Sequence, residues 1–123
     1  MSQRFLILGA SSFYGSSFVQ LLQEKGEEVS MLLRPWRLGA RLPKERFDVI
    51  VNFISLNRVP ESWVKTGRYT HTNVVKTTEL FGYLRKAEFG RFIHVSTPEV
   101  YGSSLEWVKE DQPFNPSTPY AVT

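Results

Sequence analysis

The sequence predicts an α/β fold in which helices join about four parallel strands. Two observations support this prediction: short, continuous apolar runs recur along the chain, and segments with helical periodicity separate them. Continuous apolar runs are typical of strands that are buried on both faces of a parallel sheet. Because parallel neighbours need crossover connections, the alternation predicts a doubly wound sheet in a single domain, residues 1–123.

The first part of the chain is expected to form a strand, a helix and a second strand. The run Arg4–Leu8 predicts a buried strand that ends at Gly9. From Gly15 onward, apolar residues recur at helical spacing, and Gly26 after a polar segment indicates the end of this helix. A second strand is expected from residue 28 to residue 33. These elements together form a β-α-β unit.

The second part of the chain is expected to add two strands and one long helix. Residues 35–46 contain two prolines and a glycine, which favour a loop. A third strand is expected over residues 47–54 and a fourth over residues 91–96, with Gly90 in the connection before it. A helix is expected between these strands, from Thr72 to Ala87. The side chains expected on its buried face are Val74, Thr77, Leu80, Phe81 and Leu84.

Composition limits the classes of protein to which the chain can belong. The 15 Lys and Arg against 12 Asp and Glu give a net charge of +3, and 41% of the residues are hydrophobic, as in globular proteins. The chain has no cysteine and its two histidines are far apart in sequence, so we expect no metal site. Its first apolar segment is too short for a signal peptide, and no run reaches the length of a membrane span. We therefore expect a cytoplasmic protein that binds no membrane. Its aromatic residues lack basic residues interleaved at regular spacing, so we also expect no nucleic-acid partner.

The turn after the first strand carries the main functional motif. Gly9 and Gly15 stand six residues apart, with Ser12 midway between them. In dinucleotide-binding folds, glycines at the first strand-to-helix turn allow a tight bend, close approach of the backbone to a pyrophosphate, and close packing of the helix on the strand. The amide groups that begin the helix then receive the anion. The expected phosphate-binding residues are Gly9, Ser12, Phe13, Tyr14 and Gly15.

Several segments, taken in chain order, resemble the patterns of one enzyme family. Residues 9–15, GASSFYG, are similar to a G-x-x-G-x-x-G turn, and residues 48–54, DVIVNFI, resemble the fourth strand of this family. Residues 72–74, TNV, match a T-N-V helix segment. Residues 95–103, VSTPEVYGS, and 115–123, NPSTPYAVT, resemble S-T-D-E-V-Y-G and N-P-x-S-P-Y-x-x-x-K. These are patterns of the extended short-chain dehydrogenase/reductases, specifically the NAD-dependent epimerase/dehydratase family that acts on nucleotide sugars.

The resemblance implies a Rossmann-like domain that binds NADP or NAD and, in the intact parent protein, a nucleotide-sugar substrate. By resemblance, the catalytic residues are Thr97, Tyr120 and a lysine four residues after the tyrosine. Glu99 is either a further acid–base residue or an ordinary solvated carboxylate. A phenol with a pKa of about 10 is a poor base near neutrality, and an adjacent ammonium favours its ionised form. The printed chain stops before that lysine and before the family's substrate domain. We therefore expect a truncated N-terminal part that is inactive by itself.

Three positions depart from the family pattern. Ser12 replaces the middle glycine, where a positive φ would be strained, although its hydroxyl could donate a hydrogen bond to a phosphate oxygen. Arg34 stands where NAD-type members place an acid, which favours the 2′-phosphate of NADP; an ordinary exposed arginine is the alternative interpretation. Pro98 occupies the aspartate position of S-T-D-E and cannot transfer a proton. This favours epimerisation or simple oxidoreduction over sugar dehydration.

The third strand–helix unit of the family is shortened to the twelve residues 35–46. Twelve residues extend to roughly 40 Å, so this connection can pass the first strand, but the adenine side of the pocket would lose a wall. The resemblance also implies a homodimer through the helix at 72–87. The other cofactor-binding residues that we expect from it are Phe53, Ile54, Ser55 and Asn73.

Two other functions are compatible with the sequence. A complete short chain would act as an NADP(H)-binding sensor without chemistry. A degenerate fold would bind no cofactor, and the serine at position 12 and the shortened connection favour it. Affinity for the dinucleotide separates these alternatives. A sensor would bind NADP(H) tightly by itself, a separated cofactor-binding part would bind it weakly, and a degenerate fold would bind neither NAD nor NADP.

Overall fold

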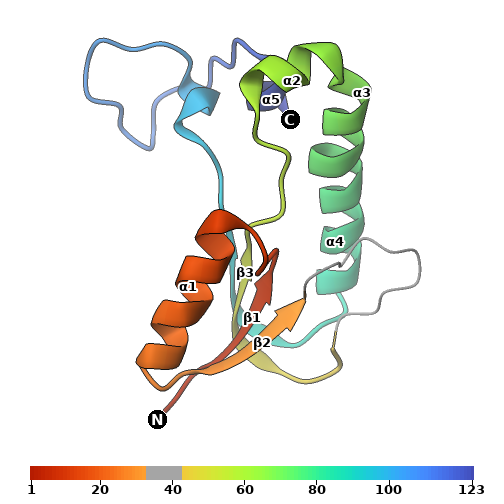
Figure 1. Cartoon of the computed structure of the whole chain (residues 1–123), viewed down its shortest axis with the longest axis vertical. Helices are drawn as coiled ribbons and strands as arrows, with labels where there is room; N and C mark the ends of the chain where they lie inside the picture. Colours follow the sequence, from red (N-terminus) through yellow and green to blue (C-terminus); the bar gives the residue numbers. More distant parts are fainter. Residues whose placement is uncertain (33–42) are drawn as a thin grey trace. The chain divides into compact units, whose positions relative to one another are not determined.

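A computed structural model of the chain describes residues 1–32 and 43–123. The chain divides into two compact units, the first comprising Met1–Ile54 and Thr78–Val95 and the second Ser55–Thr77 and Ser96–Thr123. Figure 1 shows the elements of both. Arg34 and most of the loop expected at 35–46 lie outside the described residues.

Within the described residues, the first unit is built on a four-stranded parallel sheet (Figure 1). The strands lie in the order β2-β1-β3-β4, and each neighbouring pair is parallel. This arrangement confirms the α/β fold with a parallel sheet that the sequence predicts. The strands are β1, Arg4–Leu8; β2, Glu28–Leu32; β3, Phe47–Asn52; and β4, Phe89–His94.

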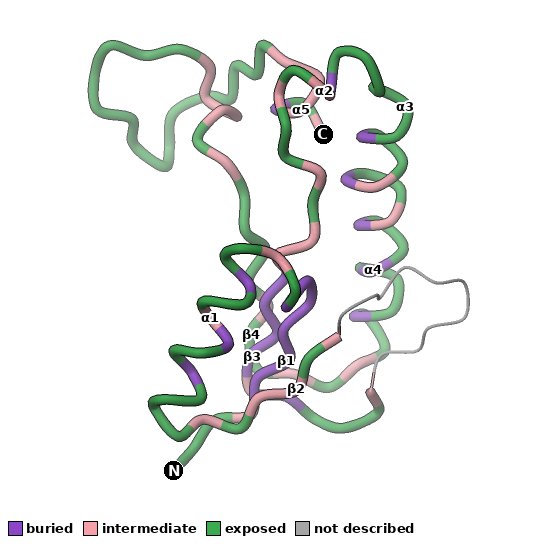
Figure 2. Tube along the Cα trace, viewed as in Figure 1, coloured by how far each residue is buried: buried purple, intermediate pink, exposed green. Residues whose placement is uncertain are grey.

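Strands β1 and β3 form the buried centre of the sheet (Figure 2). Residues 5–8 are at most 8% exposed, and residues 49–52 are at most 9% exposed. Because both faces of these strands are covered, their sequences are almost entirely apolar. The outer strand β4 differs, since four of its six residues are exposed.

The expected position of the fourth strand is two residues too late. Strand β4 begins at Phe89, and Gly90 lies inside it instead of in the connection before it. A Cβ at position 90 would come within 2.7 Å of the backbone oxygen of Asp48 on the neighbouring strand. The glycine therefore marks a close approach of two strands, not a break in the chain.

One helix covers each face of the sheet. Helix α1, Phe13–Glu24, packs Val19 and Leu22 against the face formed by the odd-numbered core residues of β1 and β3. Helix α4, Lys76–Leu84, packs Leu80 and Leu84 against the opposite face. Each of these buried leucines contributes about 2 kcal/mol of transfer free energy. The core therefore consists of two apolar layers separated by the sheet.

The buried face of the long helix differs from the predicted one. The π-helical segment η1, Thr70–Val75, directly precedes α4. A π-helical turn contains an extra residue, so the period of a regular α-helix no longer holds across it. Val74 and Phe81, predicted to be buried, are 41% and 44% exposed. The prediction is correct for Thr77, Leu80 and Leu84.

The second unit consists of short helices and loops. Residues 60–67, for which the sequence allows either a loop or the beginning of a helix, are mostly helical. Tyr69 is fully buried in this unit. Its hydroxyl accepts a hydrogen bond from the Arg58 amide at 3.0 Å and donates one to the Arg58 carbonyl at 2.8 Å. This pair of bonds fastens helix α3, Thr66–Tyr69, to the residues that enter helix α2, Val59–Val64. The helices are α2, Val59–Val64; α3, Thr66–Tyr69; η1; the 3-10 helix η2, Pro98–Tyr101; and α5, Pro119–Val122.

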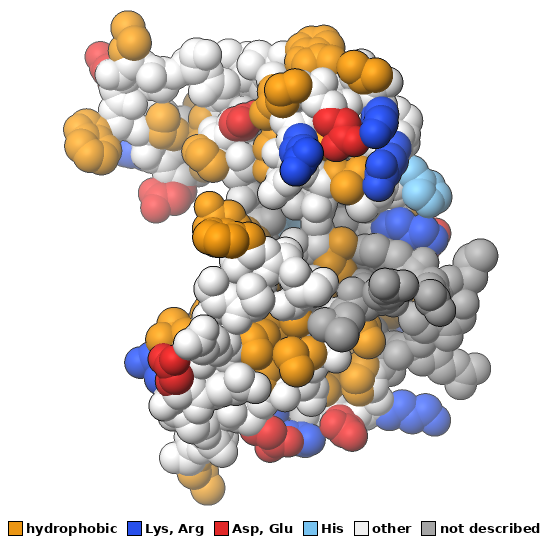
Figure 3. All heavy atoms as spheres, viewed as in Figure 1, with side chains coloured by type: hydrophobic (Ala, Val, Ile, Leu, Met, Phe, Trp, Pro, Cys, Tyr) orange, Lys and Arg blue, Asp and Glu red, His pale blue; other side chains and the backbone are white. Residues whose placement is uncertain are grey.

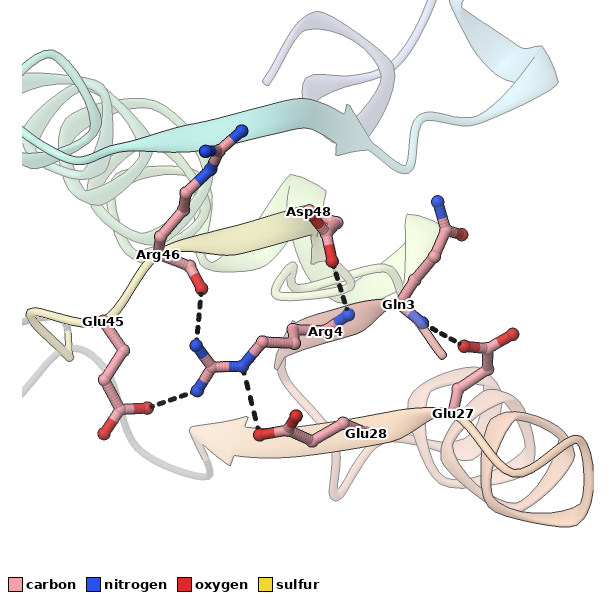
Figure 4. A network of polar contacts seen from close by, with 7 residues as sticks. All are labelled: Gln3, Arg4, Glu27, Glu28, Glu45, Arg46 and Asp48. Carbon is pink, nitrogen blue, oxygen red and sulfur yellow. Dashed lines mark hydrogen bonds and ion pairs between the residues drawn. The ribbon is translucent and has the colours of Figure 1, made fainter. Parts of the chain in front are cut away.

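Arg4 connects three segments at the end of the sheet where β1 begins (Figure 4). Its guanidinium pairs through Nε with Glu28 at 3.1 Å and through Nη2 with Glu45 at 3.4 Å. Its Nη1 donates a hydrogen bond to the Arg46 carbonyl at 3.3 Å, and its backbone amide donates to Asp48 at 2.8 Å. Strand β1 therefore holds both β2 and the residues that enter β3.

Replacing Arg4 with methionine should lower the free energy of unfolding by about 1 kcal/mol, because exposed ion pairs contribute only a fraction of a kcal/mol each. The loss should shrink in about 1 M salt, which screens exposed charges. Urea unfolding at low and high salt measures both effects. Lys25→Met is the control, since the described residues provide no ion pair for Lys25. A loss of equal size at both salt concentrations would contradict this interpretation.

Candidate functional site

Close backbone contacts require both glycines of the turn between β1 and α1. Gly9 has a φ of +77°, and a Cβ there would lie 3.0 Å from Ile54 Cγ1 and 3.1 Å from the Phe53 carbonyl carbon. A Cβ on Gly15 would collide with the carbonyl oxygen of Gly9 and lie 2.7 Å from Ser12 Oγ. A side chain at Gly15 has no room, and one at Gly9 would combine tight contacts with a strained positive φ.

Ser12 caps the N-terminus of α1. Its backbone is extended, with φ −72° and ψ 163°, and its Oγ accepts a hydrogen bond from the Gly15 amide at 3.0 Å. The strain that a positive φ would cause at this serine therefore does not arise. The Ser16 amide is bonded to the Ser12 carbonyl at 2.8 Å.

The first two amides of α1 remain open to a ligand. In the part of the chain that the structure describes, the amides of Phe13 and Tyr14 donate no hydrogen bond to the backbone or to the side chains of this turn. The first turn of α1 carries no acidic side chain. The side chains of Phe13 and Tyr14 are exposed, and their rings meet edge to face at 5.3 Å. Open amides at the positive end of a helix dipole suit an anion.

Residues Phe53 and Ile54 follow β3 and lie directly against the turn. The Phe53 amide donates a hydrogen bond to the Leu8 carbonyl at 2.9 Å. The Ile54 amide donates to Asn52 Oδ1 at 3.1 Å, and Asn52 Nδ2 lies 3.1 Å from His94 Nδ1. Sequence reasoning missed Asn52 and His94. The feature that could have revealed them is that each is a polar residue at the end of a strand, and that the two strands, β3 and β4, are neighbours in the sheet.

Asn73 fastens two segments of the second unit together. Its Oδ1 accepts a hydrogen bond from the Leu56 amide at 2.8 Å, and its Nδ2 donates to the Leu56 carbonyl at 2.9 Å and to Thr123 Oγ1 at 3.1 Å. The side chain is 8% exposed. Asn73 thus joins the residues that follow Ser55 to the end of helix α5.

The hydroxyl residues expected to be catalytic also belong to the second unit. Thr97 caps η2, and its Oγ1 accepts a hydrogen bond from the Glu99 amide at 3.3 Å, which leaves its own proton for donation. Tyr120 lies on α5 and is partly buried. Helices η2 and α5 contact each other. The fold therefore brings the segments that carry Thr97, Glu99 and Tyr120 together.

The described residues contain neither a metal-binding cluster nor a membrane-spanning helix. Within residues 1–32 and 43–123, no group of three or more His, Cys, Asp or Glu side chains is arranged to hold a metal ion. Across the same ranges, every helix is too short or too polar to cross a membrane. Arg34, the residue expected to favour NADP, lies outside them.

Comparison with known proteins identifies the family. The model of the NAD dependent epimerase/dehydratase family matches residues 5–123. The dTDP-glucose 4,6-dehydratase of Streptomyces niveus is 30% identical over 153 aligned residues, which cover 97% of this chain and 45% of that protein. Because this alignment is longer than the 123-residue chain, the Streptomyces protein contains at least 30 residues there that this chain lacks.

Solved structures agree with the family model. The Pseudomonas aeruginosa protein RMD, complexed with NADPH, is 28% identical and superposes with a TM-score of 0.81 over 98% of this chain and 45% of that one. MoeE5, in complex with UDP-glucose and NAD, is 26% identical with a TM-score of 0.82 over 97% of this chain and 44% of that one. The chain spans less than half the length of the relatives it matches. With its parallel Rossmann-like sheet and a family match from residue 5 to residue 123, the chain belongs to the NAD-dependent epimerase/dehydratase family.

Proposed function

We propose that this chain forms the cofactor-binding part of an NAD(P)-dependent epimerase or dehydratase-like oxidoreductase. The dinucleotide's diphosphate would bind the amides of Phe13 and Tyr14. The pair of open amides above a turn closed by Gly9 and Gly15 carries this proposal. The complexes of RMD with NADPH and of MoeE5 with NAD support it. The roles of Arg34, Phe53, Ile54, Ser55 and Asn73 in cofactor binding stay predictions from the family resemblance.

For the intact parent protein we propose oxidation of a nucleotide-sugar hydroxyl. A bound nicotinamide supplies the hydride acceptor for this chemistry. Thr97 would hydrogen-bond the sugar oxygen, and Tyr120 would take up the hydroxyl proton. Pro98 provides no proton, so Glu99 is the acid–base side chain that remains in this segment. Epimerisation or simple oxidoreduction therefore fits these residues better than elimination of water.

Dinucleotide binding is the direct test of this function. Calorimetric titration of the purified chain with NADPH and NADH should show binding, and a hundredfold excess over the dissociation constant should stabilise the fold by about 2.7 kcal/mol.

If Arg34 meets the 2′-phosphate, NADPH should bind more tightly than NADH, and Arg34→Ala should remove the difference. Tight binding by the isolated chain would favour the sensor function, whereas weak binding is expected of a separated cofactor-binding part. Failure of both dinucleotides to bind, or to raise the melting temperature, would support the degenerate fold.

Ser12 should limit the affinity of the proposed diphosphate site. Its side chain stands at the position where a glycine lets the backbone approach the pyrophosphate. Ser12→Gly should therefore tighten NADPH binding several-fold while changing the free energy of unfolding by only a few tenths of a kcal/mol. Ser12→Ala, the matched control, should destabilise the chain by about 1 kcal/mol because it loses the cap. Weaker binding by Ser12→Gly would instead show that the hydroxyl donates to the phosphate.

We also propose self-association through the long helix at 72–87. Apolar side chains reach the surface of the chain, as the face in Figure 3 shows, and on this helix Val75 and Tyr83 are 42% and 47% exposed. Exposed apolar patches of this kind mark interaction surfaces. Sedimentation equilibrium should detect a dimer that Tyr83→Glu dissociates, whereas Lys25→Glu should leave it intact. A monomer at every concentration would argue against this interface.

A further inference from the structure

Asn52 and His94 meet where β3 and β4 end. The two residues are direct partners in the parallel register, and Asn52 Nδ2 lies 3.1 Å from His94 Nδ1. Asn52 is 1% exposed, so its amide needs partners within the protein. Neither residue belongs to the proposed cofactor-binding or catalytic set. They lie beside Phe53 and Ile54, the two residues that contact Gly9 of the turn.

The hydrogen-bond pattern fixes the protonation state of His94. Asn52 Oδ1 accepts from the Ile54 amide at 3.1 Å, so Asn52 turns its Nδ2 toward the imidazole. Because a side-chain NH₂ group only donates, His94 Nδ1 must be the acceptor and carry no proton. The single proton of the neutral ring is then on Nε2. A proton added to Nδ1 would place two donors face to face.

Ile54 connects this pair to the turn. A Cβ on Gly9 would lie 3.0 Å from Ile54 Cγ1 and 3.1 Å from the Ile54 amide nitrogen, so Gly9 rests directly on Ile54. The same amide nitrogen is held by Asn52. Rotation of the Asn52 amide would therefore release the backbone that supports Gly9.

We propose that Asn52 and His94 are positioning residues for the dinucleotide-binding turn, and that dinucleotide affinity falls when His94 takes up a proton. Neutral His94 holds the Asn52 amide, Asn52 holds the Ile54 amide, and Ile54 supports Gly9. This inference rests on the proposed function of the turn.

The surroundings of His94 favour its neutral form. Its ring packs against Phe81 of α4 and Phe92 of β4, with ring centroids 6.3 Å and 6.2 Å away, while the rest of the side chain remains exposed. Burial lowers the pKa of His94 from its usual 6.5. The charged residues on the elements packed around it are Asp48 on β3, Arg91 on β4, and Lys76 and Glu79 on α4.

The direction of the pH effect follows from this lowered pKa. The usual pKa of a histidine is 6.5. As the pH falls below this value, the unfolded chain takes up a proton on His94 before the folded chain does. The contribution of the pair is therefore complete above that pH and is lost as the pH falls through the lowered pKa of His94. Dinucleotide affinity should follow the same direction.

The affinity of four proteins for NAD⁺, measured by calorimetry from about pH 5 to 8, tests this inference. NAD⁺ is the probe because the 2′-phosphate of NADP⁺ titrates near pH 6 and would obscure the result. Wild type should lose about fivefold in affinity on acidification, the equivalent of one hydrogen bond. His94→Asn keeps an acceptor near Nδ1 and does not titrate, so its affinity should not depend on pH. His94→Leu should bind weakly at every pH, and His71→Asn should behave as wild type.

Nitrogen NMR of the imidazoles tests the pair without any dinucleotide. At neutral pH, His94 should show an unprotonated Nδ1 and a proton on Nε2, and Asn52→Leu should abolish this preference. A proton on Nδ1 would overturn the inference even if NAD⁺ binds. So would NAD⁺ binding by wild type that is equally tight at all pH values. Absence of binding at every pH would refute the proposed function and the role of the pair in binding, while the NMR result would still report on the hydrogen bond itself.

Discussion

The rest of the structure depends on the close approach of the Gly15 backbone to the carbonyl oxygen of Gly9. A methyl group at position 15 would not fit beneath that oxygen, so only glycine allows α1 to begin so near the end of β1. This contact lets α1 lie on the sheet and bury Val19 and Leu22. It also places the first amides of the helix close to the end of β1. The capacity to receive an anion thus comes with the packing of helix on strand.

Elements that are buried on both faces could be located from the sequence alone. Strand β1 has the predicted bounds, and β3 ends two residues before the predicted end, because continuous apolar runs report burial directly. Strand β4 was harder to locate, because it is largely exposed and because Gly90, which lies inside it, resembles in the sequence a glycine that ends a connection. The π-helical segment η1 changes the period of the long helix, which no regular pattern can anticipate.

The candidate site was predictable where it is local in sequence. Gly9, Ser12 and Gly15 lie within one turn, so their spacing is visible in the chain itself. The partners of buried amides are not visible in this way: Asn52 meets a histidine 42 residues away, and Asn73 bonds to Leu56 and Thr123, 17 and 50 residues away. Such pairs depend on strand register and on helix placement. A motif therefore identifies the turn, whereas hydrogen-bond partners that are distant in sequence emerge only from the folded arrangement.

The contacts of Arg4 also bear on how this family can change in length. Arg4 pairs with Glu28, the first residue of β2, and with Glu45, just before β3, so one side chain holds the beginnings of both neighbouring strands. The cost of closing a loop grows only slowly with the number of residues between fixed ends. The number of residues between β2 and β3 can therefore vary while β1 keeps its pairing with both strands. The position is a natural place for domain architecture to diverge, and for a designer to insert new sequence.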